Sequence, residues 1–134
     1  MKSKNIVGFA RKMFIVVIAS IIFVTNIEAK TYSKNQCKKY AYSVVTNKYH
    51  WSIEDYNNLV KLWNRESSWN AKAYNKRSGT CGIPQAKPCS KMRSYGKDYR
   101  NNCKIQISWG LNYIKKRYKN PTNAWKHFQK THWY

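Results

Sequence analysis

The sequence predicts a single, mainly α domain with an irregular central loop constrained by disulfides. Apolar residues recur with helical spacing in four separate segments. Between the second and third segments, residues 70–100 contain glycines, prolines and two cysteines without a regular pattern. A chain of 134 residues usually forms one domain, and 43% apolar residues are enough to build a core. These three observations exclude a disordered chain and favour helices around one loop.

The first helix is expected from Ser33 to about Asn47. Ser33 and Gln36 have the spacing of a capping box, in which each side chain accepts a hydrogen bond from the other residue's backbone N–H. Apolar residues then recur along one helix face within residues 37–45. Both signals agree on where this helix starts and which face it buries.

Three more helices are expected further along the chain. The second begins at Ser52, with Asp55 as its capping partner, and carries an apolar stripe. The third runs near residues 105–118, with apolar side chains on one face. The last begins at Asn120, because the following Pro121 suits the first helical turn.

The first 29 residues have the layout of a secretory signal peptide. A basic start precedes the apolar run 13–27, and Ile27-Glu28-Ala29 suits signal peptidase. An uncleaved anchor is the alternative, but a membrane span needs about 20 apolar residues. Thr25 and Asn26 interrupt a run that is already shorter than this. We therefore expect a secreted protein of residues 30–134 with no stable membrane anchor.

The charge balance is strongly basic and restricts the chemistry. The chain has 26 Lys and Arg against 5 Asp and Glu, a formal charge of +21. Residues 1–29 hold four basic residues and one acidic residue, so the exported part carries +18. So few carboxylates nearly exclude an acid-rich calcium site. The charge also indicates anionic partners, although solubility alone is a simpler explanation.

The four cysteines lie in the exported part of the chain and predict two disulfides, because an even number is typical of exported domains. Zinc is the alternative, but there is no Cys-x-x-Cys and the histidines lack ligand spacing. We therefore expect no metal and no cofactor. Three pairings are open. We favour Cys81–Cys89 as a local loop and Cys37–Cys103 as a link from the first helix to the later half.

Glu66 interrupts the apolar stripe of the second helix. It occupies an inward position one turn after Trp63, near the helix C-terminus, where the dipole opposes negative charge. Burial there would raise its pKa and keep a proton on it near neutral pH. The alternative is a structural Glu paired with Arg65 or a lysine. Of the other carboxylates, Glu54 and Asp55 fit helix capping.

Three segments follow one another along the chain: Glu66-Ser67, residues 82–85 (Gly-Ile-Pro-Gln) and residues 110–114 (Gly-Leu-Asn-Tyr-Ile). They resemble the Glu-Ser pair, the Gly-Leu-Met-Gln segment and the Gly-x-x-Tyr-Leu helix of the lytic transglycosylases of the soluble-lytic (SLT) type, and more narrowly of small secreted bacterial members of this lysozyme-like superfamily. The resemblance covers about residues 55–134. Pro84 replaces the usual Met, and the late Ala-Tyr-Asn motif corresponds to residues 127–129 (His-Phe-Gln).

The resemblance implies a lysozyme-like fold in which Glu66 is catalytic. Substrate-binding roles are then expected for five residues: Ser67, Trp69, Gln85, Tyr113 and Gln129. Each has a structural alternative, such as a helix-end hydroxyl for Ser67, a loop hydrogen bond for Gln85 or a buried helix position for Tyr113. Among the tryptophans, Trp69 and Trp133 are the expected platforms for sugar rings.

The function implied is cleavage of the β-1,4 bond between N-acetylmuramic acid and N-acetylglucosamine, leaving 1,6-anhydro ends. One carboxylate suffices for this reaction, whereas most glycosidases use two; Asp98 is not excluded as a second. Hydrolysis by the same Glu66 is one alternative, and a non-catalytic cationic protein that binds walls or membranes is another. We expect a monomer whose partners are peptidoglycan and anionic wall polymers. Nucleic acid binding is disfavoured by the signs of export.

Overall fold

The computed structural model describes residues 30–134, and the expected signal peptide lies outside these residues. The fold is mainly helical, as predicted, with one small two-stranded sheet. Along the chain the elements are α1 (Lys34–Ser43), η1 (Val44–Lys48), α2 (Ile53–Ser67), β1 (Tyr74–Asn75), β2 (Thr80–Cys81), η2 (Cys89–Tyr95), α3 (Cys103–Tyr118) and α4 (Pro121–Thr131). No helix within the described part is long and apolar enough to cross a membrane.

The predicted helix starts are confirmed. The capping box at Ser33 is formed, and the backbone N–H of Asp55 donates to the Ser52 hydroxyl at 3.1 Å while the Asp55 carboxylate accepts from the Ser52 backbone. The Asn120 side chain accepts from the backbone N–H of Asn123 at 2.9 Å, and Pro121 is the first residue of α4. These caps are short-range, which is why the sequence was sufficient to predict them.

Asp55 also joins two helices. Its second carboxylate oxygen accepts from the hydroxyl of Thr122 at 2.6 Å and from its backbone N–H at 3.2 Å, at the start of α4. Burial pushes the pKa of Asp55 upward, but the hydrogen bonds from Thr122 and Ser52 outweigh burial and leave the pKa lowered. The carboxylate is therefore a structural link between α2 and α4.

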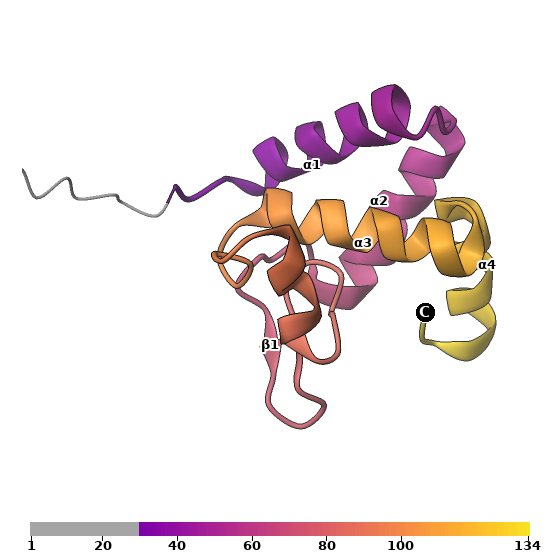
Figure 1. Cartoon of the computed structure of the whole chain (residues 1–134). Coiled ribbons are helices and arrows are strands. Elements are labelled where there is room, and N and C mark those ends of the chain that lie inside the picture. The colour runs from indigo at the N-terminus through magenta and orange to yellow at the C-terminus, as the bar shows by residue number, and fades with distance from the viewer. Residues whose placement is uncertain (1–29) are drawn as a thin grey trace, which may run out of the picture.

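The core lies between the helices, where α4 packs against both α2 and α3 (Figure 1). The largest side chains that are fully buried here come mainly from α2 and α3: Leu59, Leu62, Trp63, Ile107, Leu111 and Ile114. Helix α1 lies along α3, and the central loop occupies the opposite side of α3 (Figure 1). The irregular loop is therefore packed against the helical core on one side only.

Both favoured disulfides are formed. Cys37–Cys103 links the first turn of α1 to the first residue of α3 across 66 positions of sequence. Cys81–Cys89 joins β2 to η2 and closes a local loop. The first bond ties the two helix starts together, and the second restrains the loop that follows the hairpin.

A buried glutamine organises the central loop. Gln106 of α3 is 0% exposed; its side-chain oxygen accepts from the backbone N–H of Ile83 at 2.8 Å. Its amide donates to the carbonyls of Ala71 at 2.8 Å and Tyr99 at 2.9 Å. A side chain at Gly82 would lie 2.7 Å from that amide, so the close approach requires glycine. Three loop segments therefore meet on one side chain that the sequence pattern did not single out.

Candidate active site

Glu66 lies in the last turn of α2, where the helix is about to end. Ser68 follows with a left-handed backbone (φ 51°), which turns the chain toward the hairpin. The Glu66 side chain is half-buried, and burial raises the pKa of its carboxyl from 4.5 to about 7. The sequence predicted both the inward position and the direction of this shift.

Glu66 opens into a cleft of about 420 Å³. The walls come from α2, the β1–β2 hairpin, the loop after it and the segment that follows α4: Glu66, Asn75, Ser78, Thr80, Gln85, Lys87, His132, Trp133 and Tyr134. Within residues 30–134, no other Asp or Glu side chain lines this cleft. Asp98 instead accepts from the Asn101 side chain at 3.1 Å in a turn outside it.

Tyr134 ties three parts of the cleft together. Its hydroxyl accepts from the indole N–H of Trp63 at 2.7 Å and donates to the carbonyl of Pro84 at 2.9 Å. Burial raises the pKa of this phenol well above its usual value, and the negative charge of Glu66 raises it further. The hydroxyl therefore keeps its proton and remains a hydrogen-bond donor beside Glu66.

A family model for the transglycosylase SLT domain matches residues 46–130. The chain belongs to this family. No curated protein and no solved structure matches the chain. As a member of the SLT family, the protein is a lytic transglycosylase that acts on the glycosidic bonds of peptidoglycan. The matched region begins before α2 and ends within α4, so it contains Glu66 and most of the cleft.

Two predicted site residues of this SLT domain hold the loop that forms the cleft wall. The Ser67 hydroxyl donates to the carbonyl of Ile83 at 2.9 Å. Gln85 lines the cleft with a left-handed backbone (φ 52°), and its side-chain oxygen accepts from Thr80 at 2.6 Å while its amide donates to Gly82 at 2.9 Å. Both side chains thus take part in loop structure at the edge of the site.

The other three predicted residues of the SLT site are more dispersed. Tyr113 lines a smaller hollow of about 100 Å³ that shares Gln85, Lys87 and Tyr134 with the Glu66 cleft. Trp69 is 1% exposed and belongs to the core, where its indole N–H donates to Val60 at 3.2 Å. Gln129 is exposed on α4 and does not line the cleft. The structure brings Glu66, Ser67, Gln85 and Tyr113 together, but not Trp69 or Gln129.

Trp133 is the tryptophan that reaches the SLT cleft. It is 49% exposed, and its ring is fixed by an edge contact with His127, with centroids 4.4 Å apart. The guanidinium of Arg117 lies 5.3 Å from the same ring. Trp133 was one of two expected sugar platforms, and the structure places it, rather than Trp69, at the cleft.

Proposed function

We propose that Glu66 is the single catalytic acid and base of this lytic transglycosylase. The observation that carries the proposal is its half-buried carboxyl, with a pKa raised to about 7, in a described cleft that contains no other Asp or Glu side chain. A group with this pKa holds a proton on a large share of molecules near neutral pH and can also accept one. One side chain can therefore serve both halves of the reaction.

In the first half, protonated Glu66 donates its proton to the oxygen that bridges N-acetylmuramic acid and N-acetylglucosamine. The bond from this oxygen to C1 of the muramoyl sugar breaks, and the glucosamine end leaves as an alcohol. In the second half, the carboxylate takes the proton of the muramoyl C6 hydroxyl as that oxygen bonds to C1. The product is a 1,6-anhydro end, no water is consumed, and Glu66 regains its proton.

The remaining cleft residues support binding and positioning. Trp133 offers an exposed aromatic face of the kind that packs against a sugar ring. Asn75, Ser78 and Thr80 line the hairpin side and supply polar groups for hydroxyl or acetamido groups. Tyr134 keeps Pro84 and Trp63 in place beside Glu66. Lys87 adds a positive charge that suits an acidic substrate.

The masses of soluble products test the anhydro reaction against hydrolysis. We expect the purified enzyme to release muropeptides from peptidoglycan that are about 18 Da lighter than hydrolytic ones, the mass of one water. A commercial muramidase digest of the same peptidoglycan supplies the hydrolytic standard. Products of full mass would show that water attacks C1, so that the enzyme works as a muramidase with the same Glu66.

The pH dependence follows from the raised pKa. Because the acid must be protonated, kcat/KM is expected to be constant below pH 7 and to fall about tenfold per pH unit above pH 7. A carboxyl at its ordinary pKa would instead place this fall near pH 4.5. The measurement is the rate of turbidity loss of peptidoglycan across pH 4–9 at constant ionic strength. An alkaline limb close to 4.5 would contradict a desolvated Glu66.

We further propose that the enzyme is exported with removal of residues 1–29 and works as a monomer at the cell wall. The basic start and apolar run of that segment support export. The two disulfides support it independently, because such bonds persist outside the reducing cytoplasm.

A further inference from the structure

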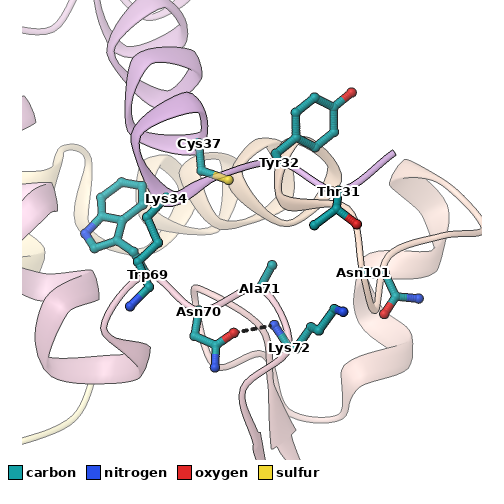
Figure 2. A pocket seen from close by; sticks show the side chains of 9 residues that line it. All are labelled: Thr31, Tyr32, Lys34, Cys37, Trp69, Asn70, Ala71, Lys72 and Asn101. Atoms are coloured by element: carbon teal, nitrogen blue, oxygen red, sulfur yellow. Dashed lines mark hydrogen bonds between the residues drawn. The ribbon is translucent and has the colours of Figure 1, made fainter. Parts of the chain in front are cut away.

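Three hollows adjoin one another on the side of the molecule where α1 and α3 begin. The first, of about 410 Å³, shares Tyr32 with the second, of about 240 Å³. The second shares Lys72 and Asn101 with the third, of about 270 Å³. Figure 2 shows the second hollow, with Lys34 reaching in from α1 and Lys72 from the loop after α2. The shared residues make the three hollows neighbours in a row, and together they are here called the basic groove.

The basic groove is lined by six cationic side chains: Lys30, Lys34, Lys39, Lys72, Arg100 and Lys104. None of the four carboxylates in residues 30–134 lines it. Asp98 touches its margin, because its carboxylate accepts from the side chain of Asn101 at 3.1 Å. The groove therefore concentrates positive charge that the described part of the protein does not neutralise internally.

The helix ends in the basic groove add to this charge. The starts of α1 and α3 are joined by Cys37–Cys103, and neither helix has an acidic residue in its first turn. Instead, Lys34 and Lys104 occupy first-turn positions, where the positive end of the helix dipole disfavours a cation. Helix α2 follows the usual preference, with Glu54 and Asp55 in its first turn. An external anion bound at these helix starts would offset the unfavourable interaction between the lysines and the helix dipoles.

Aromatic rings hold one of these lysines in place. The ammonium of Lys104 lies 5.0 Å from the ring centroid of Tyr32 and 5.2 Å from that of Tyr40. The ammonium of Lys30 lies 5.7 Å from the ring centroid of the same Tyr32. Cation–π contacts restrict where these flexible side chains place their charge. The first hollow is thus a preorganised cationic site.

The hairpin separates the basic groove from the Glu66 cleft. Tyr74 pairs with Cys81, and Asn75 pairs with Thr80. Neighbouring residues on a strand point to opposite faces, whereas paired residues share a face. Tyr74 and Cys81 line the third hollow, and Asn75 and Thr80 line the Glu66 cleft. Two sites therefore lie back to back on one small sheet.

We propose that the basic groove binds an extended phosphodiester polymer of the cell wall while the Glu66 cleft engages a glycan strand. Phosphate is the anion that helix N-termini and lysines both favour. A flexible chain fits a row of three neighbouring hollows, each too small for a folded partner. The wall location rests on the proposed function. The groove adds a second substrate-surface contact that does not depend on catalysis.

Binding to purified poly(glycerol phosphate) chains tests the proposal. The variant combines Lys34→Gln, Lys72→Gln and Lys104→Gln, and the control combines Lys116→Gln, Lys126→Gln and Lys130→Gln, which remove equal charge from α3 and α4. We expect the groove variant to raise Kd about tenfold or more and the control to change it by less than about threefold. The slope of log K against log salt should fall by about 2 in the groove variant alone.

Comparison of the two variants, and of other polyanions, distinguishes binding in the groove from binding by net charge alone. Equal losses in both variants would overturn the groove, because the net charge of the protein would then explain binding. Binding to duplex DNA with the same loss in the groove variant would overturn the assignment to a wall polymer, as would equal affinity for polyglutamate. The Tm of the groove variant should change little, since removing two lysines from helix N-termini offsets the loss of the Lys104 contacts with Tyr32 and Tyr40. Cleavage of phosphate-free peptidoglycan should stay at the wild-type rate, and failure of all proteins to cleave it would refute the proposed function alone.

Discussion

Glu66→Gln is expected to lower the rate of peptidoglycan cleavage by about 100- to 10,000-fold, the usual contribution of a general acid or base. The amide keeps the size of the side chain and removes the proton that the glycosidic oxygen needs. The cleft in the described structure has no other Asp or Glu side chain to replace it. The measurement is kcat/KM from release of soluble muropeptides, with the same product separation used for the wild type.

Glu54→Gln is the matched control, because Glu54 is an exposed carboxylate at the other end of the same helix. It is expected to retain activity and to lose only a fraction of a kcal/mol, about 0.3–1, of helix-end stabilisation. Full activity in Glu66→Gln would refute the single-carboxylate mechanism. A loss of activity in both variants would indicate damage to α2 rather than to catalysis.

Glu66→Gln is also expected to change how the free energy of unfolding depends on pH. Unfolding releases the Glu66 carboxyl to its ordinary pKa of 4.5, whereas the folded protein holds it at about 7. Below pH 4.5 both states are protonated; between pH 4.5 and 7 the unfolded state ionises first, so this group costs the fold stability as pH rises. Glu66→Gln removes that penalty. The free energy of unfolding of Glu66→Gln, relative to that of the wild type, should therefore rise from pH 4.5 to 7. Above pH 7 this difference should stay constant.

Gln106→Ala is expected to destabilise the fold by about 3–5 kcal/mol, since it leaves buried backbone groups without partners and opens a cavity. The groups affected are the N–H of Ile83 and the carbonyls of Ala71 and Tyr99. Gln85 belongs to the loop that Gln106 holds and lines the cleft, so the activity of the folded variant should fall as well. Chemical unfolding and muropeptide release on the same preparations measure the two effects.

Gln129→Ala provides the same chemical change at an exposed position. It should leave the free energy of unfolding within about 0.5 kcal/mol of the wild type. A comparably small effect of Gln106→Ala would contradict the role of Gln106 as the anchor of the central loop. Gln106→Glu offers a second comparison, because it keeps the acceptor for Ile83 but removes the amide donor.

The elements that could be predicted from sequence are those set by nearby residues. Caps such as Ser52 with Asp55 lie three positions apart, and apolar stripes reveal the buried helix faces. The inward position of Glu66 followed from the same periodicity. The β1–β2 hairpin and η2 were not predicted individually, because two-residue strands and a short 3₁₀ turn have no detectable period.

The site residues that sequence missed depend on distant contacts. Tyr134 bonds to Trp63 across 71 positions and to Pro84 across 50, so no local pattern marks it. Gln106 looks like an ordinary helix residue until three loop segments are folded onto it. Trp69 shows the converse limit: a tryptophan near Glu66 in the sequence is equally compatible with a sugar platform and with the core, where the structure places it. Composition gives no way to distinguish these two environments.

The bridge from Trp63 through Tyr134 to Pro84 has a consequence for the acidity of Glu66. The segment after α4 supplies one wall of the Glu66 cleft, and its docking depends on hydrogen bonds to α2 and to the central loop. Because burial is what raises the pKa of Glu66, loss of this wall would expose the carboxyl to water and shift its pKa back toward 4.5. The raised pKa of Glu66 is therefore a property of the assembled tertiary structure and not of α2 alone.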